Sequence, residues 1–127
     1  MATILVVDDY QPNRVALVAV LEAAEHRVIE ADNGVDALAK ARAERLDLVI
    51  CDLLMPRMDG YELTRRLRAT AAYQITPIIM VSSRAEFQDK ARGLEAGANV
   101  YVVKPPQESE LLVTARLLSY MPRARKE

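Results

Sequence analysis

The stretch VICDLLMP, residues 49–56, decides how the chain folds and where its chemistry lies. Its apolar start continues back to Leu48, which predicts a buried strand over residues 48–51. Asp52 follows directly, and an ionised carboxylate is very costly to bury without a partner. The residue is therefore either a local cap or a functional group held at the open end of a strand.

Four further runs of the same kind alternate with helix-like segments along the chain. The predicted strands cover residues 4–7, 28–29, 48–51, 77–81 and 100–103. They are rich in Val, Ile and Leu, as in strands covered on both faces, and the short second strand is expected at a sheet edge. The predicted helices cover residues 13–24, 35–44, 59–69, 83–97 and 106–120.

Polar residues and one glycine mark the ends of these helices. Asn33 and Asp59 are the predicted N-caps of the second and third helices, and Ser83 opens a capping-box signature before the fourth. Gly97 is expected to end the fourth helix in a left-handed conformation. Alternating strands and helices predict one α/β domain, in which a parallel sheet carries helices on both faces.

Composition narrows the class of protein. The 127 residues are the size of one domain, and 51% hydrophobic residues suffice for one core. No apolar run is long enough to span a membrane, and the start MATILVVDD lacks the basic region of a secretory signal. The single cysteine, Cys51, fits a reducing compartment, so a cytoplasmic location is expected. A net charge of −1 gives no support for a nucleic-acid surface.

The chain ends in the basic stretch PRARKE, residues 122–127. It is interpreted as a frayed end or the start of a linker. The predicted organisation is a single domain over residues 1–120 followed by a basic tail or linker stub over residues 121–127. His26 is expected to be a solvated residue without a partner, which excludes it from a metal site.

Polar side chains directly follow four of the five predicted strands. They are Asp8 and Asp9, Asp52, Ser82 and Lys104. Strand carboxyl ends form the functional edge of a parallel sheet, so these groups are expected to meet there. Three carboxylates repel one another unless a cation joins them, and Mg²⁺ prefers such oxygen ligands. With the ammonium and hydroxyl groups they would hold a phosphoryl group, and Asp52 could itself become an aspartyl phosphate.

Each of these residues alone has a simpler interpretation. Asp8 and Asp9 would cap the following helix, and Lys104 would be a solvated lysine. Tyr101 would be an amphipathic residue at the edge of the sheet. Cys51, next to the candidate acceptor, is interpreted as a small apolar residue of a buried strand. It is the joint pattern that favours a phosphoryl site.

The chain resembles the receiver domains of two-component response regulators over about residues 3–120. The matching motifs are VVDD at 6–9, DLLMPRMDG at 52–60, MVSS at 80–83, GLEAGA at 93–98 and YVVKP at 101–105. The resemblance implies a flavodoxin-like, doubly wound (βα)5 fold whose sheet has the strand order 2-1-3-4-5. It also implies a phospho-accepting signalling switch, which catalyses only its own phosphorylation and dephosphorylation and is not otherwise an enzyme.

The resemblance assigns a role to each residue of the site. Asp52 is the implied phosphoacceptor, and Lys104 pairs with the phosphoryl oxygens. Ser82 is the implied switch hydroxyl and Tyr101 the switch aromatic, and the Lys104–Pro105 bond is expected to be cis. The implied cofactor is Mg²⁺, with Mn²⁺ as an alternative. Its implied ligands are the carboxylates of Asp8, Asp9 and Asp52 and the backbone carbonyl of Leu54.

The resemblance also implies the partners. The phosphoryl donor is a sensor histidine kinase, a histidine phosphotransfer protein or a small phosphodonor. The fourth helix, fifth strand and fifth helix form the implied readout surface, which acts on a downstream effector or a fused output domain. The same surface could form a homodimer. No direct contact with nucleic acid or membrane is expected.

Five residues depart from the family's usual pattern. Arg57 stands where glycine is frequent, and Pro106 replaces the bulky apolar residue that often follows the KP pair. Asn99 and Val100 stand where receivers of transcription factors often carry two acids, and Thr114 where they often carry arginine. These three replacements weaken the expectation of the salt-bridged dimer of that subclass. We expect the Pro106 replacement to change how the last helix starts and packs.

Three alternatives stay open at this stage. A phosphohydrolase of the haloacid-dehalogenase type shares the strand-end aspartate, but the second acid it needs is replaced by Leu54. A flavin-binding flavodoxin needs a phosphate loop rich in hydroxyls and glycine, and the corresponding segment DDYQPN is acidic. A degenerate receiver used only for docking would not require the complete set of acids, hydroxyl and lysine.

Overall fold

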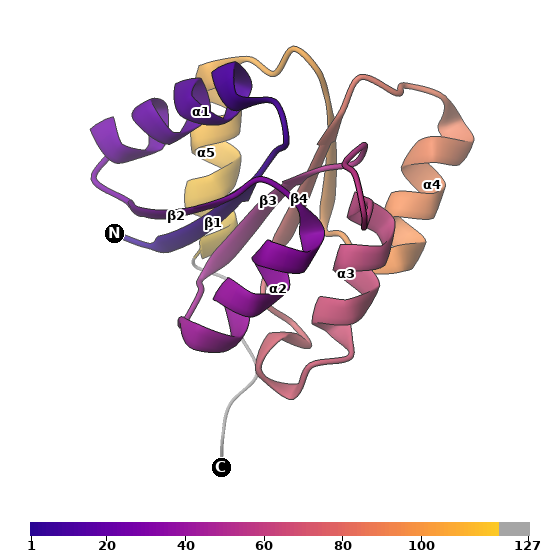
Figure 1. Cartoon of the computed structure of the whole chain (residues 1–127). Helices are drawn as coiled ribbons and strands as arrows, with labels where there is room; N and C mark the ends of the chain where they lie inside the picture. The colour runs from indigo at the N-terminus through magenta and orange to yellow at the C-terminus, as the bar shows by residue number, and fades with distance from the viewer. Residues whose placement is uncertain (120–127) are drawn as a thin grey trace.

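The computed structural model describes residues 1–119, in which five strands alternate with five α-helices (Figure 1). The strands are β1 (Thr3–Val7), β2 (Arg27–Ala31), β3 (Leu48–Asp52), β4 (Ile78–Ser82) and β5 (Val100–Val103). The helices are α1 (Gln11–Ala23), α2 (Gly34–Ala43), α3 (Gly60–Arg68), α4 (Phe87–Ala96) and α5 (Glu108–Ser119), with a 3₁₀ turn η1 (Ala71–Tyr73). Tyr120 and the predicted tail over residues 121–127 lie outside the described residues.

The five strands form one parallel sheet in the order β2-β1-β3-β4-β5, which confirms the predicted fold and the edge position of β2. The register pairs Val7 of β1 with Cys51 of β3, and Asp52 of β3 with Val81 of β4. The carboxyl ends of these three neighbouring strands are therefore level. Side chains that follow them are brought together at one edge of the sheet.

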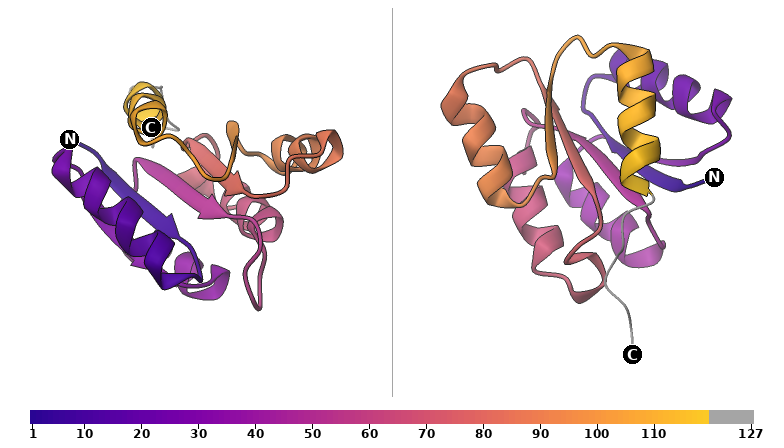
Figure 2. Two further views of the ribbon diagram at one scale, coloured as in Figure 1. Left: turned by 90° about the horizontal axis from the view of Figure 1, so that it is seen from above. Right: turned by 180° about the vertical axis from the view of Figure 1, so that it is seen from behind.

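Alternate residues of each strand face opposite sides of the sheet and build two cores. One core packs beneath α1 and α5 and takes from the three central strands Ile4, Val6, Leu48, Ile50, Ile79 and Val81. The other packs beneath α2, α3 and α4 and takes Leu5, Val7, Val49, Cys51, Ile78 and Met80. Figure 2 shows α5 in front of the sheet with α1 beside it when the molecule is seen from behind. Both faces are covered, as the continuous apolar runs predict.

Most predicted helix ends are confirmed. Asn33 caps α2, since its Oδ1 accepts the Asp36 N–H at 2.8 Å, and Asp59 caps α3 through the Glu62 N–H at 2.9 Å. Gly97 ends α4 with φ of +120°, a backbone conformation that favours glycine. These ends were readable because a short polar side chain or a glycine satisfies a local need of the backbone.

The predicted start of the fourth helix is wrong. Helix α4 begins at Phe87, and its N-cap, Glu86, makes no side-chain capping bond, so Ser83 does not cap it. The preceding backbone is bonded elsewhere. The N–H of Arg84 donates to Ser82 Oγ at 3.1 Å, and its carbonyl accepts the Tyr101 hydroxyl at 2.7 Å. These tertiary bonds hold the segment in a loop.

Helix α5 also begins later than predicted. It starts at Glu108, and the N–H of Leu111 donates to the carbonyl of Gln107 at 2.9 Å. Pro105 and Pro106 precede it, and neither can donate a backbone hydrogen bond. The two prolines therefore lie in the connection between β5 and the helix.

His26 has a partner, which corrects the expectation that it is solvated and alone. Its Nδ1 accepts the Ala2 N–H at 3.1 Å, and the residue is half-buried. Desolvation, with the positive N-terminus and Arg116 nearby, lowers its pKa below the ordinary value of 6.5. The ring therefore joins the turn after α1 to the start of β1.

Arg68, the last residue of α3, joins several elements at the amino-terminal ends of the strands, opposite the aspartates. Its Nε donates to the Gly97 carbonyl at 3.0 Å, and its Nη1 donates to the carbonyls of Tyr73 and Thr76 at 2.8 and 2.7 Å. Its Nη2 donates to Asn99 Oδ1 at 2.9 Å. One guanidinium thus joins α3, η1, the end of α4 and the starts of β4 and β5.

Among the described residues, no helix is both long and apolar enough to cross a membrane.

Candidate functional site

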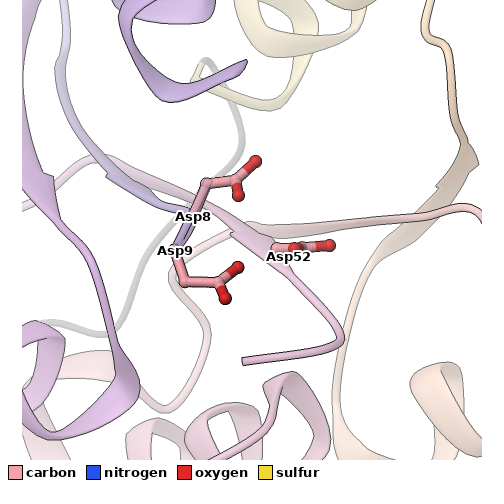
Figure 3. A group of neighbouring side chains, drawn as sticks. All are labelled: Asp8, Asp9 and Asp52. Carbon is pink, nitrogen blue, oxygen red and sulfur yellow. The ribbon is translucent and has the colours of Figure 1, made fainter. Parts of the chain in front are cut away.

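Three carboxylates meet at the carboxyl edge of the sheet (Figure 3). Asp8 and Asp9 directly follow β1, and Asp52 is the last residue of β3. One oxygen from each lies within 4.8 Å of the others. Asp8 and Asp52 are buried and Asp9 is exposed, so solvent reaches the cluster at Asp9.

Lys104 joins this cluster from the end of β5. Its Nζ lies 3.2 Å from Asp52 Oδ1 and 3.4 Å from Asp8 Oδ2. The Lys104–Pro105 bond is cis, as the resemblance implies. The ammonium therefore stands between the two buried carboxylates.

Burial changes the acidity of Asp52. Desolvation raises the pKa of its carboxyl above the ordinary value, and the nearby Asp8 raises it further. The Lys104 ammonium and the N–H of Leu53, which donates at 2.9 Å, act in the opposite direction. Desolvation is the largest of these effects, so the pKa stays raised. The cluster itself sets three carboxylates against one ammonium, which leaves an excess of negative charge. The site therefore favours a further cation.

The three carboxylates fit a small divalent metal ion. Magnesium binds oxygen ligands at about 2.1 Å in an octahedron, which places ligand oxygens about 3–4 Å apart. The observed spacing of up to 4.8 Å needs only small side-chain adjustments to reach this range. Asp8, Asp9 and Asp52 could each supply one oxygen. Leu54 lies in the loop that follows β3, with its side chain 49% exposed.

Neither acid of the first pair caps the helix that follows, although that alternative was open. The N-cap of α1 is Tyr10, which makes no side-chain capping bond. Asp8 Oδ1 accepts the Tyr10 N–H at 2.9 Å in a local turn, which orients the carboxylate. The other oxygen of Asp8 faces Lys104. The turn positions the acid for the cluster.

Ser82 and Tyr101 are linked through a single residue, Arg84. The Ser82 hydroxyl is buried and accepts the Arg84 N–H, while the Tyr101 hydroxyl donates to the Arg84 carbonyl. The Arg84 guanidinium also lies 3.8 Å from Asp89 in the first turn of α4. The two predicted switch residues are thus connected with each other and with α4.

Gly93 is a residue of this network that sequence reasoning left without a role. A Cβ placed at Gly93 would lie 2.9 Å from the ring of Tyr101 and 3.2 Å from the sulfur of Met80. The missing side chain is what lets the Tyr101 ring pack against α4. The signal was present in the GLEAGA motif, but only the tertiary structure shows which side chain faces the glycine.

Cys51 does not take part in the chemistry of the site. The thiol is fully buried, and burial raises its pKa to about 12. Its sulfur lies 4.0 Å from the Thr64 hydroxyl. A protonated thiol is a poor nucleophile and a poor metal ligand, which agrees with its interpretation as a core residue.

The chain is 40% identical over 114 residues to protein PilH of Pseudomonas aeruginosa, covering 90% of this chain and 94% of PilH. The chemotaxis response regulator CheY4 of Vibrio cholerae superposes with a TM-score of 0.88 at 36% identity, covering 93% of this chain and 98% of that one.

A third relative was solved with a bound metal. It is the receiver domain of the sensor histidine kinase PA1611 of P. aeruginosa, with a magnesium ion coordinated in its active-site cleft. It has a TM-score of 0.88 at 31% identity and covers 94% of this chain and 98% of its own. Other curated relatives are longer, and the chain spans about half of their length or less. The family model described as the response regulator receiver domain matches residues 4–116, and on this evidence the chain belongs to that family.

Proposed function

We propose that the chain is a switch of two-component signalling that accepts a phosphoryl group on Asp52. The observation that carries this proposal is the junction of three carboxylates with the Lys104 ammonium at the open end of β3. Asp52 is held by a rigid central strand, and its neighbours supply the charges that phosphoryl transfer requires. The proposed site residues are those that the family resemblance implies.

The transfer itself is a simple substitution at phosphorus. An ionised carboxylate oxygen of Asp52 attacks the phosphorus of a phosphohistidine, and a P–O bond forms as the P–N bond breaks. The bonding electron pair goes to the imidazole nitrogen, and the product is an acyl phosphate. The Lys104 ammonium, already 3.2 Å from Asp52, pairs with the incoming phosphoryl oxygens.

Asp8, Asp9 and Asp52 would hold Mg²⁺, with Mn²⁺ as an alternative and the Leu54 carbonyl as a further ligand. When bound, the ion neutralises the negative charge that gathers on the phosphoryl group. Asp8 contributes to this site from a fixed position, because its carboxylate is bonded to the Tyr10 N–H and to Lys104. The magnesium ion in the PA1611 receiver domain supports this assignment.

Phosphorylation would act on the rest of the domain through Ser82. A phosphoryl group is a strong acceptor, so the Ser82 hydroxyl gains a group to donate to, and turning toward it would move Oγ away from the Arg84 N–H that it accepts. Arg84 also binds Tyr101, and a shift of this residue changes the packing of the aromatic ring against α4. The output is then a change in the surface formed by α4, β5 and α5.

The proposed donor is a sensor histidine kinase or a histidine phosphotransfer protein. The changed surface would be recognised by a downstream effector or by an output domain in the same protein, and it could form a homodimer. The support for these partners is membership of the family. In the part of the chain that the structure describes, α4 and α5 present exposed apolar residues, among them Phe87 and Leu117.

The test of the proposed function is the intact mass of the protein after incubation with Mg²⁺ and acetyl phosphate or phosphoramidate. The expected product is one phosphoryl adduct that hydroxylamine removes, as it does from acyl phosphates. Asp52→Asn should lose the adduct. Asp36→Asn, which changes an exposed acid on α2, should keep it. If the wild-type protein binds Mg²⁺ but forms no adduct, the proposal is wrong and a docking role becomes the better one.

A further inference from the structure

A pocket lies beside the aspartates, on the face of the sheet that α1 and α5 cover. It has a volume of about 260 Å³ and lies between these two helices. Ile50 and Val81 of the central strands form its floor, and both are buried. Figure 2 shows α1 and α5 side by side on this face when the molecule is seen from behind.

The walls of the pocket are mostly apolar, with the exposed Asn13 of α1 as a polar exception. Ala16, Leu17 and Val20 line it from α1, and Leu111 lines it from α5. Leu17 and Val20 are half-buried and Ala16 is exposed, so the rim is open to a molecule that arrives from solvent. An apolar pocket with an open rim is the usual form of a site for a small organic ligand.

Pro105 and Pro106 line the pocket from the connection before α5. Pro106 is half-buried, and its ring adds apolar surface beside Leu111. The pocket is therefore bounded on this side by compact side chains.

One end of the pocket is polar, and that end is the phosphoryl site itself. Asp8, Asp52 and Lys104 line it, because Asp8 and Asp52 share the strand parity of the residues in this face of the core. Asp9, the third carboxylate of the metal cluster, does not line the pocket, and the ammonium pairs with the two carboxylates that do, so an organic ion of either sign gains little at this end. Carboxylate oxygens still have free lone pairs, so they can accept a hydrogen bond from a neutral donor.

We infer that this pocket binds a small uncharged ring compound that carries one N–H or O–H group, of the size of phenol or indole. The ring would lie between α1 and α5, and its donor would reach Asp8 or Asp52. The size agrees, since a closed apolar cavity of about 150 Å³ already accepts benzene in another protein. This inference does not depend on the phosphorylation of Asp52.

Such a ligand would give the domain a second input. It would share Asp8, Asp52 and Lys104 with the metal ion and the phosphoryl group, so its affinity and theirs must influence one another reciprocally. It would also contact the connection that joins Lys104 to α5. A neutral metabolite could then tune a switch that is otherwise set by a kinase.

The test is a ¹⁹F NMR titration of 5-fluoroindole with the full chain. The expected result is a saturable shift that fluorobenzene, which lacks the donor, produces about tenfold more weakly. Ala16→Phe places a ring in the pocket and should weaken binding at least about tenfold. Val15→Phe is the matched control, because Val15 is the preceding residue of α1, is 51% exposed and does not line the pocket.

Pro106→Phe provides an independent variant that fills the pocket from the connection before α5. In the wild-type protein, nuclear Overhauser contacts from the indole ring to the methyl groups of Leu17 and Val20 locate the probe. Loss of binding in either filled variant, with binding kept in Val15→Phe, supports the inference. Three results overturn it. They are the absence of a saturable shift, an affinity in both filled variants equal to that of Val15→Phe, and a ring located away from Leu17 and Val20.

Discussion

Asp52 occupies a place that is unfavourable for its own charge. Burial raises the pKa of its carboxyl above the ordinary value, so the folded chain holds this proton more firmly than the unfolded chain. Stability must then fall as the pH rises from the ordinary pKa through the raised one. Asp52→Asn removes the charge, and we expect it to stabilise the metal-free protein at pH 7 by about 1 kcal/mol.

Urea denaturation at pH 7 and at a pH below the ordinary pKa of aspartate measures this effect. The stabilisation should be present at pH 7 and should vanish in acid, where Asp52 is protonated in the wild-type protein too. Glu22→Gln changes an exposed acid of α1 and serves as the control. A metal-free Asp52→Asn variant that is less stable than the wild type at pH 7 would contradict the explanation.

His26 predicts a second pH dependence, of opposite sign. Its pKa is lowered, so its contribution to stability is complete above the ordinary value of 6.5 and is lost as the pH falls through the lowered value. Protonation of Nδ1 also removes the acceptor of the Ala2 N–H. Because the chain has one histidine, His26→Asn should flatten the slope of stability between pH 7 and pH 5. Thermal melts across that range would show whether it does.

Among the elements, α4 shows where prediction from sequence stopped. Strands were predictable because each apolar run is covered on both faces, and α2 and α3 because Asn33 and Asp59 cap them locally. The start of α4 was not, because Arg84 exchanges helical bonds for contacts with Ser82 and Tyr101, which lie elsewhere in the fold. The local sequence does not show hydrogen bonds to residues that lie far away along the chain.

The contact between α4 and β5 yields a prediction at the same scale. Gly93→Ala adds a methyl group where only 2.9 Å separates the new carbon from the Tyr101 ring. We expect the ring to be displaced outward and its hydroxyl to lose the bond to Arg84. The ring resonances of Tyr101 in NMR spectra should shift, while the helix gains from the replacement of a glycine within it.

Ala96→Gly is a useful counterpart, since it alters a buried position of the same helix without adding atoms near the ring. It should destabilise the protein and leave the Tyr101 resonances in place. If Gly93→Ala leaves those resonances unchanged, the glycine does not control the position of the aromatic residue.

In the molecule as a whole, different residues hold the two ends of the parallel strands together. At the carboxyl ends of the strands Lys104 pairs with Asp8 and Asp52. The opposite end is held by Arg68, which bonds to the carbonyls of Tyr73, Thr76 and Gly97. Arg68→Met would leave these buried groups without a donor, and we expect a loss of about 2–4 kcal/mol in the free energy of unfolding. Denaturation monitored by circular dichroism measures it.

Arg66→Met is the control, because Arg66 lies on the same helix but pairs only with the exposed Glu62. Its expected cost is below about 1 kcal/mol. Equal losses in the two variants would show that Arg68 is not a central tie. Phosphorylation of Arg68→Met should continue below its melting temperature, since the aspartates lie at the other edge.

The arrangement of the site was predictable because parallel strands align their carboxyl ends, so Asp8, Asp9, Asp52 and Lys104 had to meet. The pocket between α1 and α5 was not, although Pro106 stood out in the sequence. A proline in the sequence indicates a change in the backbone, but the space between two helices depends on how they are placed in the fold. Sequence motifs therefore predict the functional residues at strand ends better than they predict a pocket between helices.

The bond between Arg68 and the Gly97 carbonyl has a mechanical consequence. At that end α4 is tied to Arg68, whereas its first turn is held through Asp89, which lies 3.8 Å from the Arg84 guanidinium and whose carbonyl accepts the Tyr61 hydroxyl. A shift of Arg84 would therefore tilt the helix about its Arg68 end. The 10 residues of α4 span about 15 Å, so a tilt of about 10° about its Arg68 end moves its first residue by about 2–3 Å. The motion is largest at Phe87, whose ring is 83% exposed, and a spectroscopic label attached there would report the tilt with the greatest leverage.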